Sequence, residues 1–299
     1  MSSDPIADLA GSVIAFAEAF RAVLTANQRP APGSPAEQEA GGEPFAGDWG
    51  DYPSRDVFAT AYLTVAACTD HLLGLASVIE GRNCAFAPYT VTRGAVEAAA
   101  IGCYLTEQGI SARERLRRTM NYRLAGLCEQ VRLFGDMSSV EAQERLKRAR
   151  EQIADFARSA RAHQFDFRDV SNKGSPAYLD KPQPTAMKLI GDAADKGNPG
   201  LGRTYHRLLS ATAHSAIHGL ARMLTTVEPL EGIPGQALAA INRDARSVAV
   251  ELVVGPLTAH SLASSLEWFA GCDMSSVHGP ANQMLYTWSR IGHIGLPGT

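Results

Sequence analysis

The sequence predicts an all-α protein, a helical bundle of about six to eight helices with long antiparallel helices. Apolar residues return at steps of three and four positions over most of the 299 residues. No segment shows the alternating pattern of a half-buried strand, and no repeat of fixed period is present. With 45% apolar and 20% charged residues, the composition is that of an ordinary globular protein. We therefore expect helices along most of the chain.

The N-terminal residues 1–27 predict one amphipathic helix, which we place at 4–26. Ser3 or Asp4 would cap it, because either side chain can accept a hydrogen bond from the first backbone amides. Residues 28–54 are rich in proline, glycine and acids, so they cannot bury enough apolar surface to order themselves. We predict a linker there, or a mobile lid if its three aromatic residues fold back onto a groove: Phe45, Trp49 and Tyr52.

Two apolar helices follow, and both should lie in the interior of the bundle. The first runs from Arg55 to Ile79 and is closed by Gly81, a residue that readily ends helices. The second opens at Pro88, because the first turn of a helix tolerates proline, and continues to about Leu105. Both segments are rich in alanine and nearly free of lysine. Helices of this composition are usually buried on most sides.

Two densely charged helices come next, and we expect them to form an antiparallel hairpin on the surface. Ser111 should cap the first helix, and Ser138 or Ser139 should start the second. A short helix should follow after a break in the helical pattern. The expected helices lie at 111–135, 138–165 and, after the break at 168–183, 184–196.

The C-terminal half predicts two more long helices. One should run over 203–227 and stop before Pro229, because the residue before a proline disfavours the helical conformation. The other should occupy 236–270, with a kink at Gly255-Pro256. We assign 55–270 to a single helical-bundle domain and 271–299 to a C-terminal tail with one short helix near 280–290.

The charge balance excludes a general attraction to nucleic acid or anionic lipid, because the formal net charge is -3 and the pI is near 6.2. The five cysteines are widely separated and form no pair typical of a disulfide framework or a thiolate zinc site. No basic region precedes the first apolar residues, and no stretch approaches about 20 continuous apolar residues. We predict a cytoplasmic protein without a membrane segment, and we do not expect nucleic acid as a partner.

One polar face stands out on the otherwise apolar helix over 88–105. Tyr89, Arg93, Glu97 and Tyr104 fall on the same side at the spacing of an α-helix. Arg93 and Glu97, four residues apart, can pair with each other. A guanidinium and a carboxylate in apolar surroundings cost several kcal/mol, on the order of 5, unless both are well satisfied. The pair therefore either sets the register of the helix or serves a ligand.

A second polar face lies on the helix predicted over 203–227. Arg203, Arg207, Ser210, His214 and His218 share it, opposite an apolar face. Small residues are interleaved with them, where a solvated face usually carries lysine and glutamate. This face is either the solvated side or a surface that another helix or a ligand approaches.

A third pair of polar residues lies on the helix over 55–79. Asp70 and His71 follow Thr69 in apolar surroundings. An aspartate beside a histidine can raise the proton affinity of the imidazole or orient its ring. A core histidine bonded to a backbone carbonyl is the common alternative.

The two polar faces resemble a pattern shared by a family of all-helical bacterial proteins, mostly actinobacterial ones. Its members have a helix with Arg-x3-Glu followed by a Tyr, and a later helix with Tyr-x4-Ser-x3-His. Here these are Arg93 to Glu97 with Tyr104, and Tyr205 to Ser210 and His214. The resemblance covers about residues 57–225. It implies an all-helical fold and says almost nothing about activity.

A more distant resemblance is to HEPN domains, helical bundles in which an Arg and a His cleave RNA. Arg207 and His214 have six residues between them, at the outer limit of the spacing in that family. The polar residue that usually follows the Arg is Leu208 here, a departure from the pattern. The resemblance would make His214 a general acid or base and Arg207 a stabiliser of developing phosphate charge.

From these patterns we infer an intracellular bundle whose interior polar pocket binds a small, anionic ligand or substrate. Arg93 would clamp the anionic group, and Glu97 or His214 would move a proton. Two alternatives stay open: a non-enzymatic dimerisation or scaffold module, and an HEPN-like, metal-independent ribonuclease. The sequence does not decide whether the protein is an enzyme.

The candidate residues form two groups. The catalytic candidates are His214, Glu97 and Arg207. The ligand-binding candidates are Arg93, Tyr89, Asp70, His71, Ser210, His218 and Tyr104. His214 and His218 have a spacing that suits one metal ion, but the chain lacks the paired Glu-x2-His motifs of di-iron bundles. We expect no metal and no cofactor, and as partners a small-molecule ligand and a second copy of the chain.

Overall fold

The protein is all-α, as the sequence predicts. The computed structural model describes residues 4–42, 53–169, 176–195, 200–221, 226–229, 237–240 and 244–295. Within these ranges the chain forms twelve α-helices and two short antiparallel two-stranded sheets. The number of helices exceeds the predicted six to eight, in part because two predicted long helices are interrupted.

The N-terminal half contains six helices, and all of them except α2, which was not predicted, begin and end close to their predicted bounds. They are α1 (Pro5–Ala26), α2 (Pro35–Gly42), α3 (Pro53–Gly81), α4 (Ala87–Leu105), α5 (Ala112–Gly135) and α6 (Val140–Ala162). Three predicted caps are confirmed, because the side chains of Asp4, Ser111 and Ser139 each accept a hydrogen bond from a backbone amide of the first turn.

The C-terminal half contains more and shorter elements. They are β1 (Phe167–Arg168), β2 (Tyr178–Leu179), α7 (Ala186–Ala194), α8 (Leu201–Ala213), α9 (Ile217–Ala221), β3 (Thr226–Pro229), β4 (Ala237–Ala240), α10 (Ala245–Leu252), α11 (Val254–Ala270) and α12 (Ser275–Gly292). β1 pairs with β2 with Phe167 opposite Leu179, and β3 pairs with β4 with Thr226 opposite Ala240. The expectation of no strands is wrong at these four short segments.

The continuous helix predicted over 203–227 is wrong, because the chain turns after Ala213, forms the separate helix α9 and is part of strand β3 at 226–227. α8 ends at Ala213, and Ser215 takes a left-handed backbone with a φ of 54°. α9 folds back so closely on α8 that a Cβ at Gly219 would lie 2.7 Å from the carbonyl carbon of Ala211. A residue with a side chain would not permit this approach. Tertiary packing therefore overrides a helical periodicity that continues through the turn.

The helix predicted over 236–270 is wrong in its first part, since residues 237–240 are strand β4. α10 begins later, where the side chain of Asp244 accepts a hydrogen bond from the Ser247 amide. The axis then bends by 45° between α10 and α11, close to the predicted kink. Pro256 lies in the first turn of α11, where its missing N–H leaves no helical hydrogen bond unmade.

The segment predicted as a linker or lid is partly helical. It contains α2, and both Ser34, just before this helix, and Ala36, within it, are buried. The Ala31 amide donates to the Ala270 carbonyl at the end of α11, which attaches this segment to the bundle. The three aromatic residues of the predicted lid, Phe45, Trp49 and Tyr52, lie outside the described residues.

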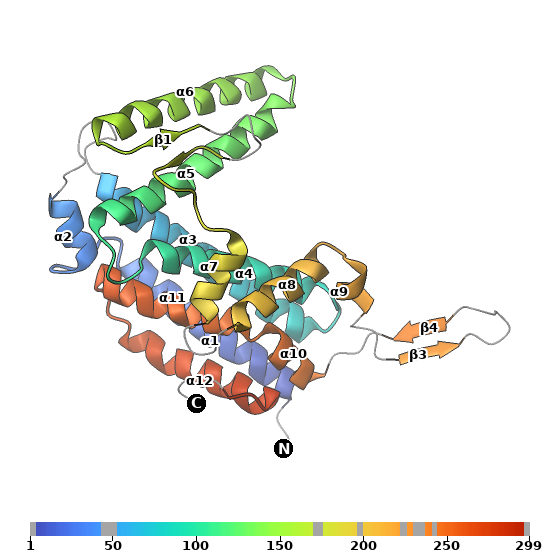
Figure 1. Ribbon diagram of the computed structural model, residues 1–299. Helices are drawn as coiled ribbons and strands as arrows, with labels where there is room; N and C mark the ends of the chain where they lie inside the picture. The colour runs from blue at the N-terminus through green and yellow to red at the C-terminus, as the bar shows by residue number, and fades with distance from the viewer. Residues whose placement is uncertain are drawn as a thin grey trace.

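Helix α4 lies at the centre of the bundle, in contact with α3, α7, α8 and α11 (Figure 1). α1 packs against α3 and α12. The segment predicted as a C-terminal tail thus contains α12, a helix of 18 residues whose buried side chains belong to the core. At Gly102 of α4 an added Cβ would lie 2.4 Å from a methyl of Leu262, so the glycine permits the close crossing with α11. The largest buried apolar side chains include Phe16, Phe20, Leu72, Phe269 and Trp288.

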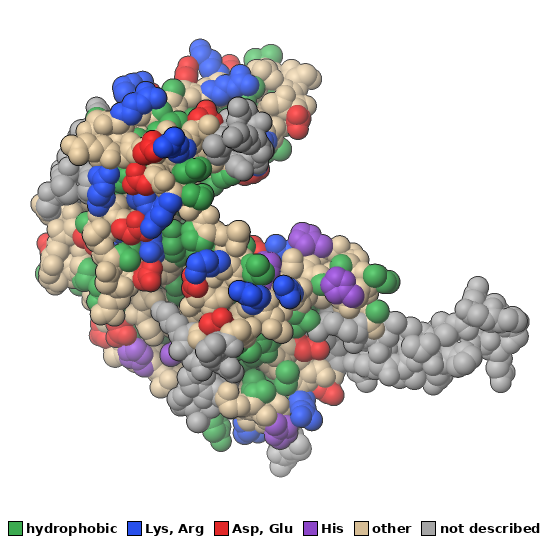
Figure 2. All heavy atoms as spheres, in the orientation of Figure 1, with side chains coloured by type: hydrophobic (Ala, Val, Ile, Leu, Met, Phe, Trp, Pro, Cys, Tyr) green, Lys and Arg blue, Asp and Glu red, His purple; other side chains and the backbone are tan. Residues whose placement is uncertain are grey.

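Helices α5 and α6 form the predicted antiparallel hairpin, which we call the arm. It stands apart from the other helices in Figure 1, and Figure 2 shows the molecular surface hollowed between the arm and the remaining helices. At the turn of the hairpin, Leu133, Met137 and Val140 expose 60%, 45% and 75% of their surface. The tip of the arm therefore exposes three large apolar side chains to solvent, beside polar ones.

Buried arginines at the base of the arm join it to the bundle. Both Arg117 and Arg118 donate to the Glu114 carboxylate, at distances of 2.7 to 2.9 Å. Arg118 also donates to the Tyr104 carbonyl of α4, and its guanidinium lies 4.1 Å from the centre of the Tyr104 ring. The hydrogen bond from Arg117 holds the pKa of Glu114 at about 2, despite partial burial. These charges are almost fully paired inside the protein.

Arg115, one turn from this cluster, is also fully buried. It donates to the carbonyl groups of Leu105 and Glu107 and to the carboxylate of Glu39 on α2. Its guanidinium lies 4.7 Å from the centre of the Phe269 ring. One side chain therefore ties together the α4–α5 turn, α2 and α11.

Two helices are long and apolar enough to cross a membrane by length and composition, Pro5–Ala26 and Ser54–Gly81. The bent pair α10 and α11 would be a third if it were counted as one span. In each of the two helices 44% of the apolar window is buried against other parts of the protein. Cytoplasmic location stays a prediction.

Candidate functional site

The two polar faces that the sequence singles out meet between α4 and α8. Arg93 donates from Nε to the Glu97 carboxylate at 2.7 Å, and its Nη1 lies 2.7 Å from Nε2 of His214. Arg93 and Glu97 sit four residues apart on α4, and His214 caps the C-terminal end of α8. The cluster therefore connects the end of α8 to the middle of α4.

Arginine has donors and no acceptor, so in this contact Arg93 donates and Nε2 of His214 accepts the hydrogen bond. The two side chains touch directly, which leaves no space for a ligand between them. The Arg93 and Glu97 side chains expose 23% and 34% of their surface. The cluster is a half-exposed polar contact, and it does not itself form the predicted interior pocket.

His206, which the sequence reasoning did not select, lies near the same charges. Burial lowers the pKa of its imidazole, and the positive charges of Arg93 and Arg207 lower it further, against the opposing effect of Glu97. Its Nδ1 atom is buried and has no hydrogen-bond partner among the described residues. The surroundings of His206 therefore disfavour its charged form.

A cleft of about 590 Å³ lies on α8, α9 and α10, beside the cluster. Its walls are mainly apolar, and they also include one arginine, one histidine and one glutamate. The lining residues are Leu201, Thr204, Tyr205, Arg207, Leu208, Ala211, His218, Gly219, Val250 and Glu251. Figure 2 shows basic and histidine side chains gathered over α8 and α9.

Glu251 is the acidic group of the cleft, and a buried tyrosine holds it. The hydroxyl of Tyr89, whose side chain is fully buried, donates to the Glu251 carboxylate across from α4 to α10. Tyr205 of α8 donates to the Val250 carbonyl. Burial, with a smaller effect of the Glu251 charge, raises the pKa of Tyr205 to about 12. Both tyrosines therefore act as neutral donors that position α10 against α4 and α8.

The cleft brings together only some of the predicted residues. Arg207 and His218 line it, and Tyr89 reaches it through Glu251. Arg93, Glu97 and His214 form the neighbouring cluster. Ser210 is half-buried on α8 between the two.

The remaining predicted residues lie elsewhere. Asp70 is exposed on α3. His71 packs against the backbone of α4, where a Cβ at Gly94 would lie 2.7 Å from its ring. Tyr104 stacks with Arg118 at the base of the arm. Since Asp70 and His71 point to different environments, the structure does not join them into one unit.

Sequence reasoning missed Glu251 and His206. A signal existed for Glu251, because it is the one acid in the apolar stretch over 247–266. His206 lies next to Tyr205 in the family-like pattern, but neither its position nor its spacing distinguishes it from a solvated histidine. Only the packing of α4 against α8 reveals its burial.

Among the residues that the structure describes, no group of three or more histidine, cysteine, aspartate or glutamate side chains could hold a metal ion. Comparison of the chain with family models, curated proteins and solved structures finds no match. The resemblances drawn from the sequence pattern therefore stay predictions.

Proposed function

We propose that the protein binds a small molecule with an apolar body, an anionic group and a hydrogen-bond donor, in the cleft between α8, α9 and α10. The observation that carries this proposal is the placement of Arg207 and His218 on a largely apolar cleft that contains a single carboxylate, Glu251. Apolar clefts with a few convergent polar groups are the usual form of small-molecule sites.

The apolar walls would hold the body of the ligand. Leu201, Leu208 and Val250 lie on opposite sides of the cleft, on α8 and α10. Transfer of an apolar chain from water to such walls contributes about 0.8 kcal/mol for each buried CH2 group. The volume of about 590 Å³ suits a ligand of drug-like or smaller size.

The polar groups would set the orientation. Arg207 is exposed and forms no ion pair with a described residue, so its guanidinium can bind a carboxylate through two parallel hydrogen bonds. Glu251 is only an acceptor when ionised and would repel a simple anion. A ligand that also carries a hydroxyl or amine donor satisfies both groups at once.

The Arg93–Glu97–His214 cluster would stabilise the site without lining it. It holds the last turn of α8 on α4, and the chain reverses directly after this point into α9. Since α9 contributes His218 to the cleft, the position of this histidine depends on the cluster. The proposal is one of binding, and it assigns no reaction.

The test compares three eight-carbon probes by isothermal titration. We expect 2-hydroxyoctanoate to bind more tightly than octanoate, and octanoate more tightly than octan-1-ol. Arg207→Gln should weaken both acids about 10- to 100-fold, the effect of losing a charge-assisted hydrogen bond, and should leave the alcohol unchanged. Arg203→Gln, at an exposed arginine one turn earlier on α8, is the matched control.

Two outcomes would contradict the proposal. The first is equal affinity for octanoate and octan-1-ol in the unmodified protein. The second is equal loss of acid binding in the Arg207 and Arg203 variants, since a general charge effect would then explain it.

A dimerisation module is the second candidate, and the exposed apolar side chains at the tip of the arm favour it. Leu133, Met137 and Val140 lie together at one turn, and exposed apolar clusters often mark contacts with another protein. Sedimentation of the purified chain at several concentrations would show whether a second copy binds there.

A further inference from the structure

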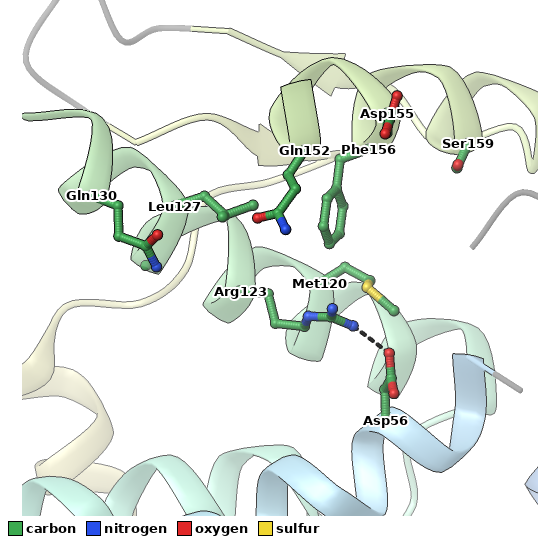
Figure 3. A pocket seen from close by; sticks show the side chains of 10 residues that line it. Asp56, Met120, Arg123, Leu127, Gln130, Gln152, Asp155, Phe156 and Ser159 are labelled. Carbon is green, nitrogen blue, oxygen red and sulfur yellow. Dashed lines mark hydrogen bonds and ion pairs between the residues drawn. The ribbon is translucent and has the colours of Figure 1, made fainter. Parts of the chain in front are cut away.

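A second cavity, independent of the cleft, lies on the arm. It has a volume of about 390 Å³ and runs between α5 and α6 to the first turn of α3 (Figure 3). Met120, Leu127 and Phe156 form its apolar part, and each exposes less than a tenth of its surface. Nothing in the two polar faces of the sequence pointed to this groove.

One end of the groove is closed by a neutralised arginine. Arg123 of α5 pairs with Asp56 of α3, and the dashed line in Figure 3 marks this contact. The same guanidinium lies 5.5 Å from the centre of the Phe156 ring. A guanidinium held in this way offers a flat surface for stacking while its charge is already balanced.

Two glutamine amides supply the polar groups along the groove. Gln130 of α5 and Gln152 of α6 lie on either side of Leu127 in Figure 3, and both are exposed. Neither side chain forms a hydrogen bond with a described residue, and each amide offers a donor and an acceptor together. Asp155 adds a further carboxylate, which pairs with Arg158. The groove therefore has no free positive charge for an anion.

Gly126 widens the groove at the centre of α5. A glycine in the middle of a helix destabilises it, so its presence needs a reason. A Cβ added there would meet no atom within 4 Å, and the residue lines the cavity. The missing side chain leaves room for a flat ligand at the cost of helix stability.

We propose that this groove binds an uncharged adenine-type base, free or as a nucleoside. A glutamine amide matches the adjacent donor and acceptor of adenine, N6 and N7, through two hydrogen bonds. Bases stack on guanidinium planes, and the exposed guanidinium of Arg123, which lies over the buried Phe156 ring, provides one. Because Arg123 is paired with Asp56 and two carboxylates line the groove, a phosphate on the ligand should not increase the binding affinity.

The experiment titrates the full chain with adenosine, uridine and AMP and follows binding by calorimetry. We expect saturable binding of adenosine, binding of AMP that is no tighter, and binding of uridine at least about tenfold weaker, because a pyrimidine ring offers less area for stacking than a purine. Gln152→Ala should weaken adenosine by about tenfold or more. Gly126→Leu fills the groove and should abolish measurable binding.

The matched control is Gly11→Leu, at an exposed glycine within α1 where an added Cβ also meets no atom within 4 Å. It should bind adenosine as the unmodified chain does. Thermal melting of both leucine variants shows whether they fold, and Gln152→Ala keeps the test decisive if Gly126→Leu does not. Absence of saturable adenosine binding, tighter binding of AMP, or full binding in Gln152→Ala would overturn the proposal.

Discussion

Two polar clusters of this protein use the same residue types in different surroundings. At the base of the arm, Arg117 exposes 2% of its side chain and shares the carboxylate of Glu114 with Arg118. Between α4 and α8, the Arg93 side chain exposes 23%, and water reaches both it and Glu97. The first cluster is buried and satisfied by the protein, whereas the second is partly exposed to solvent.

The difference shows how burial distinguishes polar side chains that stabilise the fold from polar side chains that are available to a ligand. Buried charges must be paired where they stand, because an unpaired one costs several kcal/mol, on the order of 3 to 5. Half-exposed charges are screened and can exchange partners at little cost. The sequence drew attention to the second cluster, but the first has the larger role in stability.

The largest effect should come from Glu114→Gln. The change leaves Arg117 buried without a counter-charge, so the free energy of unfolding should fall by about 3 kcal/mol. The pKa of Glu114 is lowered to about 2 in the fold from the usual 4.5. Its stabilising effect is therefore complete above about pH 4.5 and lost as the pH falls towards 2.

Urea unfolding at pH 7 and at pH 3 measures both parts of this expectation. The difference between the unmodified chain and the variant should shrink at the lower pH. A variant as stable as the unmodified chain at pH 7 would show that the arm does not depend on this carboxylate.

A much smaller effect is expected when Arg93 and Glu97 are both replaced by leucine. Both partners of a half-exposed pair are removed together, so no buried charge remains, and the stability should change by less than about 1 kcal/mol. The measurement is again urea unfolding, beside Glu114→Gln under the same conditions. A loss as large as that of Glu114→Gln would remove the distinction between the two clusters.

The smallest effect concerns the dependence of stability on pH near neutrality. Burial lowers the pKa of His206 in the folded protein, so the unfolded chain takes up the proton first as the pH falls through about 6.5. Stability should therefore decrease below that pH, and His206→Gln should reduce the decrease. His260, whose pKa burial also lowers, should act in the same direction.

Melting temperatures between pH 7.5 and pH 5.5 test this expectation in His206→Gln, in His260→Gln and in the double variant. If the slope in the double variant equals that of the unmodified chain, burial of these imidazoles does not govern the pH dependence.

Much of the helical architecture could be predicted from the sequence. Asp4, Ser111 and Ser139 cap the helices as expected, and the surface hairpin of α5 and α6 follows from its charged periodicity. These features depend on side chains within a few residues of each other. The ends of α8 and the start of α10 could not be predicted in this way, because long-range contacts decide them.

The candidate site shows the same division. The spacing of Arg93 and Glu97 on one helix allowed their ion pair to be predicted. The contact of Arg93 with His214 and that of Tyr89 with Glu251 join residues far apart in the chain, and no local pattern indicates either. The groove on the arm was not foreseen, because it depends on how α5 and α6 pack around Gly126.

The sequence by itself determined the all-α class, most helix starts and the polar residues of α4 and α8, because periodicity and capping act over one or two turns. Only the tertiary structure decided which polar residues meet, which are buried and where the cavities lie. Gly219 shows the reason, since its role is visible only where α9 lies against Ala211. Packing distances between elements, not local preferences, set these features.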